Sequence, residues 1–328
     1  MLQSHRRFGI SYGIAIFFVV TLGLISFTES AYALSNISTC QALSVPGETY
    51  ALTSDITVTG DCFDITADGI TLEGNGHKIT GDGTGIGVEI ISATGVTVQN
   101  LDISHFISGI YLTGSNANTV TNNIISYTSY GVNFVGASTN NLISSNFFYN
   151  NVNGVHAWPS TSNGNTVTLN TFYQSGHEQV QWHETNDNNL VYHNNFLNPQ
   201  LTQIIDECIG CTNQYSTASG GNFYSNYNEP IEGCNDVNLD GFCDDPYIIT
   251  DDIGNPNAQD DLPFVVQNGW DPSPNPDTAP YFVVPDDMII GTGVASGAVV
   301  TYSAFAIDVE DGIITATCTP PSGSTFSL

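Results

Sequence analysis

A repeat of about 23 residues in the middle of the chain constrains the fold more than any other feature. Its clearest copies begin at Gly87, Gly109, Gly131 and Gly154, which are 22, 22 and 23 residues apart. Each copy opens a short run in which apolar and polar residues alternate, as in β-strands, and Gly, Ser, Thr and Asn fill the gaps. A period of this length built from short strands is typical of a solenoid. The repeat therefore predicts an all-β chain folded as a right-handed parallel β-helix, in which each coil adds about 4.8 Å along the axis.

Asparagine recurs with the same period. Asn123, Asn146, Asn170 and Asn195 are 23, 24 and 25 residues apart. Asparagines at the same turn of successive coils can stack their amides into a hydrogen-bonded ladder, which satisfies backbone groups that would otherwise be buried without partners. We expect this structural role, and the alternative is a polar binding stripe.

The first 33 residues have the pattern of a secretory signal peptide. Arg6 and Arg7 precede an apolar run from residue 10 to 27, and Ala31-Tyr32-Ala33 fits a small-x-small cleavage site. The alternative is an uncleaved anchor helix. The segment predicts an extracellular or cell-surface protein.

The charge balance excludes several partners. The chain has 3 basic and 32 acidic residues, and Lys78 is its only Lys or Arg after residue 33. Nucleic acid and anionic membrane surfaces are excluded as partners, because both are bound through Lys and Arg. Such self-repulsion favours divalent cations or high salt.

Seven cysteines in an exported chain predict disulfides. Proximity in the sequence suggests the pairs Cys40–Cys62, Cys208–Cys211 and Cys234–Cys243, and leaves Cys318 over. The alternative for the last four paired cysteines is a zinc site, but the C-x8-C spacing of the second pair is too long for a usual zinc knuckle.

The segment from Asp68 to Ile79 resembles the opening coil of the NosD-type β-helix proteins, a family named for periplasmic copper binding. These proteins belong to a broader group of carbohydrate-binding and sugar-hydrolase β-helices. Similar segments include Gly220 to Tyr227, Asp236 to Tyr247 and Asp261 to Phe264, so the resemblance covers about residues 40–268. It implies the fold strongly and the function weakly.

The C-terminal part resembles a hyalin repeat, an immunoglobulin-like β-sandwich of extracellular adhesion proteins. The resemblance rests on Ala279 to Pro285, Gly297 to Tyr302, Asp308 to Gly312 and Cys318 to Phe326. About 50 residues are present, against about 100 in a complete sandwich, so we expect a truncated one. The expected divisions are a signal peptide (1–33), a capped β-helix (34–200), its C-terminal region with an acidic calcium-type loop (201–270), a linker (271–278) and the partial hyalin repeat (279–328).

The acidic loop near residue 240 has the pattern D-x-N-x-D-G of calcium loops. The expected ligands are the side chains of Asp236, Asn238, Asp240 and Asp244 or Asp245, and the carbonyl of Phe242. Tyr247 stands where an EF-hand has its bidentate Glu. The alternative is an ordinary turn clamped by Cys234 and Cys243.

A cluster of aromatic and imidazole side chains forms the second candidate site. Aligning Val155 with Val180 places Trp158 beside His183 on adjacent coils. Together with His156 and Trp182, these residues suit stacking on a sugar, and the histidines suit Cu²⁺ or Zn²⁺. The alternative is ordinary surface and core filling. Copper(I) is disfavoured because Met1 and Met288 are the only methionines.

No pattern makes a convincing active site. β-helix polysaccharide lyases commonly use Arg or Lys, and only Lys78 is available. No spacing brings two carboxylates convincingly together for glycoside hydrolysis. We therefore predict a secreted or cell-surface, non-enzymatic protein that binds glycans or extracellular matrix and surface proteins and is stabilised by calcium. The alternatives are an exported copper-handling accessory of the NosD type and a polysaccharide lyase or hydrolase.

Overall fold

The computed structural model describes residues 34–158, 161–173, 176–198, 202–271, 280–284, 288, 297–308 and 312–326. The predicted signal peptide, residues 1–33, lies outside the described residues, as does nearly all of the predicted linker. Within the described residues, no helix is long and apolar enough to cross a membrane.

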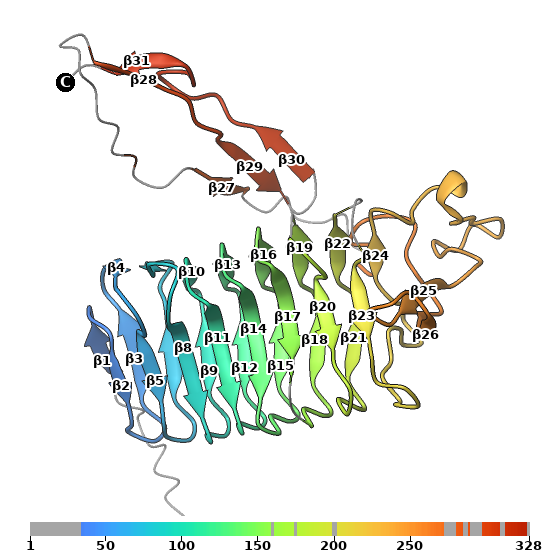
Figure 1. The fold of residues 1–328 in the computed structure, drawn as a ribbon, viewed down its shortest axis with the longest axis horizontal. Helices are drawn as coiled ribbons and strands as arrows, with labels where there is room; N and C mark the ends of the chain where they lie inside the picture. Colours follow the sequence, from blue (N-terminus) through green and yellow to red (C-terminus); the bar gives the residue numbers. More distant parts are fainter. Residues whose placement is uncertain are drawn as a thin grey trace, which may run out of the picture. The chain divides into compact units, whose positions relative to one another are not determined.

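Residues 34–260 wind into a parallel β-helix, with three strands in most coils, which confirms the predicted fold class (Figure 1). Equivalent strands of successive coils pair in parallel and form three sheets. Sheet A contains β1 (Leu34–Ile37), β3 (Thr49–Leu52), β6 (Thr71–Glu73), β9 (Thr97–Gln99), β12 (Thr119–Thr121), β15 (Leu142–Ser144), β18 (Thr166–Thr168) and β21 (Leu190–Tyr192).

Sheets B and C complete the coils. Sheet B contains β2 (Gln41–Leu43), β5 (Phe63–Ile65), β8 (Ile86–Ile91), β11 (Ser108–Thr113), β14 (Tyr130–Val135), β17 (Asn153–Ala157), β20 (Val180–Trp182), β23 (Ile204–Asp206), β25 (Tyr247–Thr250) and β26 (Pro256–Asp260), of which the last is antiparallel to its neighbour. Sheet C contains β4 (Ile56–Thr57), β7 (Lys78–Thr80), β10 (Asp102–Ser104), β13 (Ile124–Ser126), β16 (Phe147–Tyr149), β19 (Thr171–Tyr173), β22 (Asn195–Leu197) and β24 (Phe223–Tyr224). A short 3₁₀ helix, η1 (Pro230–Glu232), follows.

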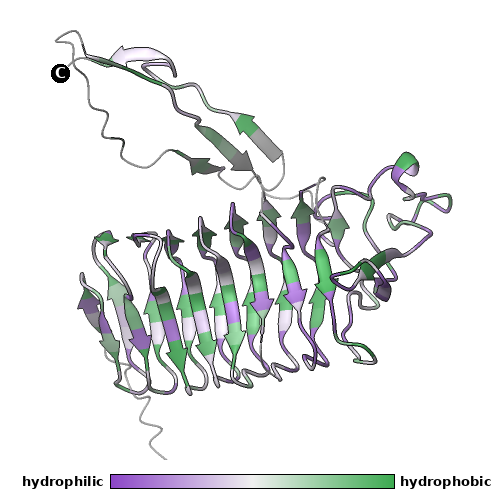
Figure 2. Ribbon diagram, in the orientation of Figure 1, coloured by the Kyte–Doolittle hydropathy of each residue, from purple (hydrophilic) through white to green (hydrophobic). Residues whose placement is uncertain are grey.

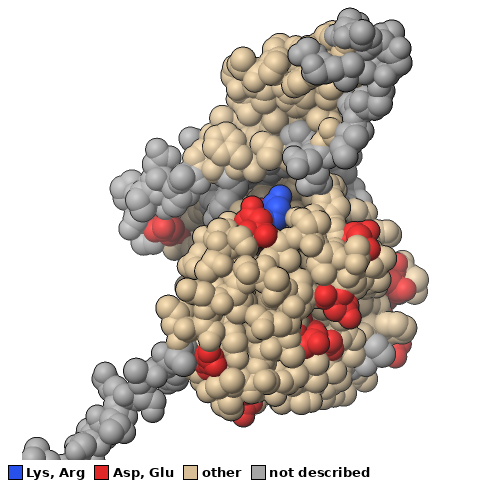
Figure 3. Space-filling model, turned by 90° about the vertical axis from the view of Figure 1, so that its left-hand side faces the viewer, with Lys and Arg blue, Asp and Glu red and all other residues tan. Residues whose placement is uncertain are grey.

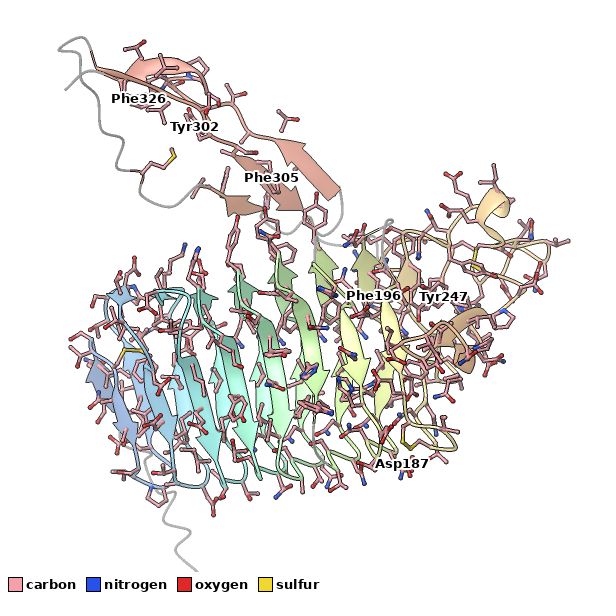
Figure 4. All side chains as sticks on the ribbon, viewed as in Figure 1. Asp187, Phe196, Tyr247, Tyr302, Phe305 and Phe326 are labelled. Carbon is pink, nitrogen blue, oxygen red and sulfur yellow. A yellow bond between two sulfur atoms is a disulfide. The ribbon has the colours of Figure 1, made fainter. Side chains whose placement is uncertain are left out.

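The core runs along the axis of the β-helix and consists of buried apolar residues from successive coils. Figure 2 shows hydrophobic positions recurring on the strands of these coils. One column of aromatic rings comes from the inner face of sheet C and ends on β25. Its members are Phe148, Phe172, Phe196, Tyr224 and Tyr247, whose successive ring centroids are 4.7, 5.1, 5.3 and 3.8 Å apart. Figure 4 labels Phe196 and Tyr247 within this column. Stacked, near-parallel rings on successive coils bury large apolar area, which stabilises the coil-on-coil arrangement.

The predicted asparagine ladder is present, but its fourth member is Asn194 and not Asn195. Each side-chain Nδ2 donates to the Oδ1 of the next residue at 3.0 Å in what we call the first asparagine column, Asn123, Asn146, Asn170, Asn194 and Asn222. The coil after Asn170 places Asn195 in β22 instead, where its Nδ2 donates to Asn268 Oδ1 at 2.6 Å. The error arose because coils differ in length, so an exact period does not identify the stacked residue.

A second asparagine column, which sequence analysis missed, runs along the other end of the sheet A strands. It contains Asn118, Asn141, Asn165, Asn189 and Asn213, with Nδ2-to-Oδ1 distances of 3.0–3.2 Å. Its signal was present in the sequence, because an asparagine stands five residues before each of Asn123, Asn146, Asn170 and Asn194.

A buried carboxylate closes each column. Asn222 Nδ2 donates to Asp260 Oδ2 at 3.1 Å, and Asn213 Nδ2 donates to Asp206 Oδ2 at 3.2 Å. All amides in a column point the same way, so the positive ends of their dipoles face the carboxylate. Gly221 is required beside Asp260, because a Cβ at this position would lie 1.8 Å from the Asp260 carboxylate.

The structure forms all three predicted disulfides, Cys40–Cys62, Cys208–Cys211 and Cys234–Cys243. Cys40 and Cys62 are 22 residues apart, so this bond joins two successive coils. Cys318 is free, as expected.

The C-terminal part contains two small antiparallel sheets. One is formed by β27 (Tyr281–Val283), β29 (Phe305–Asp308) and β30 (Gly312–Thr315), and the other by β28 (Ala298–Val300) and β31 (Ser324–Phe326). These sheets are compatible with an immunoglobulin-like part, while the hyalin repeat stays a prediction.

Candidate ligand-binding face and histidine pair

The outer face of sheet B carries one row of polar side chains along the β-helix axis. The parallel register aligns residues from six successive strands, which we call the outer column: Asp64, Glu89, Tyr111, Asn133, His156 and Gln181. Side chains alternate along a strand, so the neighbours Val155 and Ala157 point inward and are fully buried.

A chain of hydrogen bonds links this column to His183 and Glu207, which directly follow β20 and β23. His156 Nδ1 lies 3.0 Å from Asn133 Oδ1, and the Nε2 atoms of His156 and His183 are 3.2 Å apart. His183 Nδ1 lies 2.8 Å from Glu207 Oε2. The four side chains come from four successive coils, because each step along the chain of bonds is 23–27 residues.

The partners assign the protons in this chain. Asn133 Oδ1 accepts, so His156 carries its proton on Nδ1 and presents a lone pair at Nε2. His183 Nε2 faces this lone pair, and His183 Nδ1 faces the Glu207 carboxylate. Burial, with a contribution from His183, lowers the pKa of His156 to about 4, so His156 is neutral at pH 7.

The outer column also holds negative charge, and none of its members is the one described Lys or Arg, Lys78. Burial raises the pKa of Glu89 above its ordinary value, and the carboxylates of Asp64 and Asp61 raise it further. Lys78 lies on sheet C, where it pairs with Asp102 at 3.6 Å. The face is therefore acidic and rich in amide groups.

Two aromatic rings flank the histidine pair. The ring of Trp158 lies 5.7 Å from that of His183, as the alignment of adjacent coils predicted, and the Trp158 side chain is 57% exposed. The ring of Tyr130 lies 4.4 Å from that of His156. The indole thus offers an open apolar surface beside a chain of polar groups.

Trp182 does not belong to this face, which corrects the predicted ligand-binding set. The register pairs Trp182 with Ala157 and Asp206, in the column that points inward, and Trp182 is fully buried. The small side chain of Ala157 on the adjacent coil leaves room for the indole, whose ring also packs 6.1 Å from that of Phe134. Trp182 is therefore a core residue.

Sequence analysis also missed Asn133 and Glu207, which orient the two imidazoles. Each lies about one coil from its histidine, 23 residues before His156 and 24 residues after His183. Both residues stand in the sequence at one repeat length from a candidate histidine, and this spacing is the signal that indicates them.

The predicted calcium loop uses its oxygens internally. Asp236 Oδ1 and Asn238 Oδ1 accept from the Asp240 N–H, and Asp240 Oδ1 accepts from the Phe242 N–H. Asp244 Oδ2 accepts from the backbone N–H of Val237 at 2.8 Å. Among the described residues, no three His, Cys, Asp or Glu side chains come together to hold a metal ion. The loop is a turn clamped by the Cys234–Cys243 disulfide, and the structure does not support a calcium site there.

A groove with a volume of about 690 Å³ lies elsewhere, at the corner between sheets A and C. One of its two carboxylates, Glu73, already accepts from the Asn75 N–H and from the side chains of Gln99 and Asn100. The groove holds neither the histidine pair nor an exposed indole, so we place the candidate site on sheet B.

The fold and the site together define a disulfide-linked parallel β-helix protein with a polar outer face centred on two histidines. The family described as "Periplasmic copper-binding protein (NosD)" matches residues 35–229, more than half of the chain. The chain belongs to this family, which confirms the predicted resemblance. The periplasmic family and the three disulfides agree with a protein outside the cytoplasm.

One solved structure that matches is the crystal structure of an alginate lyase from Paenibacillus sp. str. FPU-7. The two chains are 15% identical with a TM-score of 0.45, and the match covers 53% of this chain and 76% of the lyase chain. No curated protein matches the chain.

Among the described residues, the candidate site offers copper two imidazole ligands. The Nε2 atoms of His156 and His183 face each other, and their Nδ1 atoms are held by Asn133 and Glu207, in the way that outer partners orient metal-binding histidines. The histidine pair thus fits the imidazole part of a copper site.

Proposed function

We propose that this NosD-family protein is an exported, non-enzymatic β-helix protein that binds glycans on the outer face of sheet B. The observation that carries the proposal is the exposed indole of Trp158 beside the polar chain of His183 and His156. A sugar ring presents an apolar face and a rim of hydroxyl groups, so it needs an aromatic surface together with fixed polar partners.

Amide groups extend the polar surface along the coils. Asn153 Nδ2 donates to Gln181 Oε1 at 3.2 Å, and Gln181 Nε2 donates to Glu207 Oε1 at 3.1 Å. These bonds fix the side chains in place before a ligand arrives, which lowers the entropy cost of binding. The partners proposed are extracellular glycans and glycan-bearing surface or matrix proteins. Calcium has no part in the proposal.

Binding is favoured over cleavage by the state of the two histidines. Each ring nitrogen of His156 and His183 is already hydrogen-bonded to another side chain of the protein. A general base needs a free lone pair within reach of the substrate proton. The pair therefore serves as a fixed polar platform.

The test is retention of the full chain on immobilised neutral, amino-bearing and uronate polysaccharides, with new chain ends scored in parallel. We expect retention on the neutral or amino-bearing polymers, loss of retention in Trp158→Ala, and no new chain ends. Trp270→Ala is the matched control, because Trp270 stacks on His193 away from the site, with ring centroids 5.3 Å apart. Equal retention of Trp158→Ala and wild type would refute the proposed face, and new chain ends would show an enzyme.

Copper handling is the second candidate, because the family is described as copper-binding and the histidine pair offers two facing nitrogens. Titration of the full chain with Cu⁺ and with Cu²⁺ tests it. Loss of tight binding in His183→Ala, but not in His177→Ala at an exposed position, would support copper. Equal copper affinity in wild type and His183→Ala would eliminate this site.

A further inference from the structure

The three disulfides differ in how much of the chain they close. Cys208 and Cys211 are 3 residues apart, whereas the other pairs are 22 and 9 residues apart. A disulfide stabilises a fold mainly by restricting the unfolded chain, and this effect grows with loop length. The Cys208–Cys211 bond therefore contributes least to holding the fold.

The same bond is also approachable from solvent. Cys211 is half-buried and lies beside an exposed tip, where Ile209 is 85% exposed and Gly210 has open space around its Cα. Cys40 is half-buried like Cys211, whereas Cys234 and Cys243 are both buried. An incoming thiol can reach the Cys211 sulfur from the tip, and the apolar Ile209 side chain offers a contact for the protein that carries this thiol.

The loop is anchored on both sides without help from the disulfide. Before it, the Glu207 N–H donates to Trp182 O at 2.8 Å, and the buried Asp206 carboxylate accepts from Tyr215 Oη at 2.8 Å. After it, the Thr212 N–H donates to Asp187 Oδ1 at 2.6 Å. Figure 4 labels Asp187 at this edge of the β-helix. Breaking the sulfur–sulfur bond thus frees a short tip and leaves both neighbouring segments in place.

From these observations we propose that Cys208–Cys211 is a redox-active disulfide that exchanges electrons with a dithiol protein outside the cytoplasm, while the other two disulfides are structural. The C-x-x-C spacing is the one that thiol–disulfide exchange centres use. A disulfide can be reduced and re-formed repeatedly when the fold keeps its shape in both redox states. Reduction of a disulfide that holds the fold together would instead unfold the chain. The proposal is independent of glycan and copper binding.

The exchange balances with a dithiol as the reductant. A partner thiolate attacks the Cys211 sulfur, and the Cys208 sulfur leaves and takes up a proton. The second partner thiol then attacks the partner's own sulfur in the mixed disulfide and releases Cys211 as a thiol. The partner is oxidised to its disulfide by two electrons, and the chain gains two thiols. Cys208 is the buried member, and Asp206 Oδ1 accepts its backbone N–H at 3.0 Å.

The experiment equilibrates the full chain with graded ratios of reduced and oxidised dithiothreitol, followed by alkylation and peptide mapping. Every sample carries Cys318→Ser, because Cys318 is a free thiol. We expect Cys208 and Cys211 to become alkylated together at ratios that leave the other four cysteines disulfide-bonded, with an unchanged circular dichroism spectrum. Reduction of all three bonds together, with loss of the β signal, would overturn the proposal, as would reduction of another bond first.

Two single variants test the order of attack. Cys208→Ser leaves the approachable Cys211 thiol and should form a mixed disulfide with an aromatic disulfide reagent quickly. Cys211→Ser leaves the buried Cys208 thiol and should react much more slowly. The double variant Cys208→Ser/Cys211→Ser should retain the melting temperature of wild type, whereas Cys40→Ser/Cys62→Ser should melt at lower temperature. Equal rates in the two single variants, or a double variant that fails to fold, would contradict the assignment.

Discussion

At the residue scale, Asp260 is the side chain whose ionisation the fold changes most clearly. It is completely buried and accepts hydrogen bonds from the Asn222 N–H, the Asn222 amide, the Tyr224 hydroxyl and the Leu262 N–H. These donors favour the carboxylate, but burial dominates and raises the pKa of Asp260 to about 7. A carboxyl that closes a column of amides is therefore also a pH-sensitive group.

Asp260→Asn is predicted to change how stability depends on pH. Since the folded pKa of Asp260 lies above its unfolded value of 3.8, its contribution is complete below pH 4 and is lost as pH rises through 7. The difference in unfolding free energy between wild type and Asp260→Asn should be larger at pH 4.5 than at pH 7.5, by about 3 kcal/mol at most. Urea unfolding at both pH values measures it. The exposed Asp252→Asn is the control, and a difference independent of pH would contradict the prediction.

The two tryptophans on adjacent coils are predicted to respond differently to truncation. Trp182→Ala removes a fully buried ring and should lower the unfolding free energy by about 3–5 kcal/mol. Trp158→Ala removes an exposed ring and should change it by about 0.5 kcal/mol or less. Urea unfolding of both variants at pH 7 checks the contrast, and similar losses in the two would show that Trp158 is also structural.

At the scale of elements, the asparagine columns tie each turn to the next. Asn146 Oδ1 accepts from the N–H and the amide of Asn123, while Asn146 Nδ2 donates to the carbonyls of Val120 and Ser144. All these groups are buried, so no water replaces a lost partner. The turns of the β-helix therefore depend on side-chain hydrogen bonds as well as on strand pairing.

Asn146→Ala is predicted to destabilise the β-helix by about 3 kcal/mol, because it leaves two buried donors of Asn123 without an acceptor. Urea unfolding measures the loss. Asn36→Ala, at an exposed position of β1, is the matched control and should change the unfolding free energy by about 0.5 kcal/mol or less. A small loss in Asn146→Ala would mean that the column is dispensable.

At the scale of the whole molecule, negative charge is the dominant property. The sequence carries a net charge of −29, and Figure 3 shows acidic side chains scattered over the surface in view. Like charges repel one another in the folded state more than in the expanded chain. Salt shortens the range of this repulsion, to about 10 Å at 0.1 M and about 3 Å at 1 M.

An increase in NaCl from about 20 mM to about 500 mM is therefore predicted to raise the melting temperature of the full chain, because salt screens the repulsion between its carboxylates. Thermal unfolding followed by circular dichroism measures this rise. CaCl₂ and MgCl₂ compared at equal ionic strength should act alike. A melting temperature that does not change with NaCl would contradict the role of self-repulsion. A rise in melting temperature that CaCl₂ causes and MgCl₂ does not would support calcium binding by the loop near Asp240.

The sequence by itself determined the β-helix, because the 22- and 23-residue spacing and the two-residue alternation are local properties that survive without knowledge of contacts. Proximity in the sequence suggested the Cys40–Cys62 bond, and the structure showed that its partners stand one coil apart. Only the tertiary structure decided that Asn194 and not Asn195 joins the first asparagine column, and that Trp182 points inward while Trp158 stays exposed. The same holds for the bonds that join Glu207 to His183 and His183 to His156. The physical reason is that coils differ in length, and a shift of one residue moves a side chain from one face of a strand to the other.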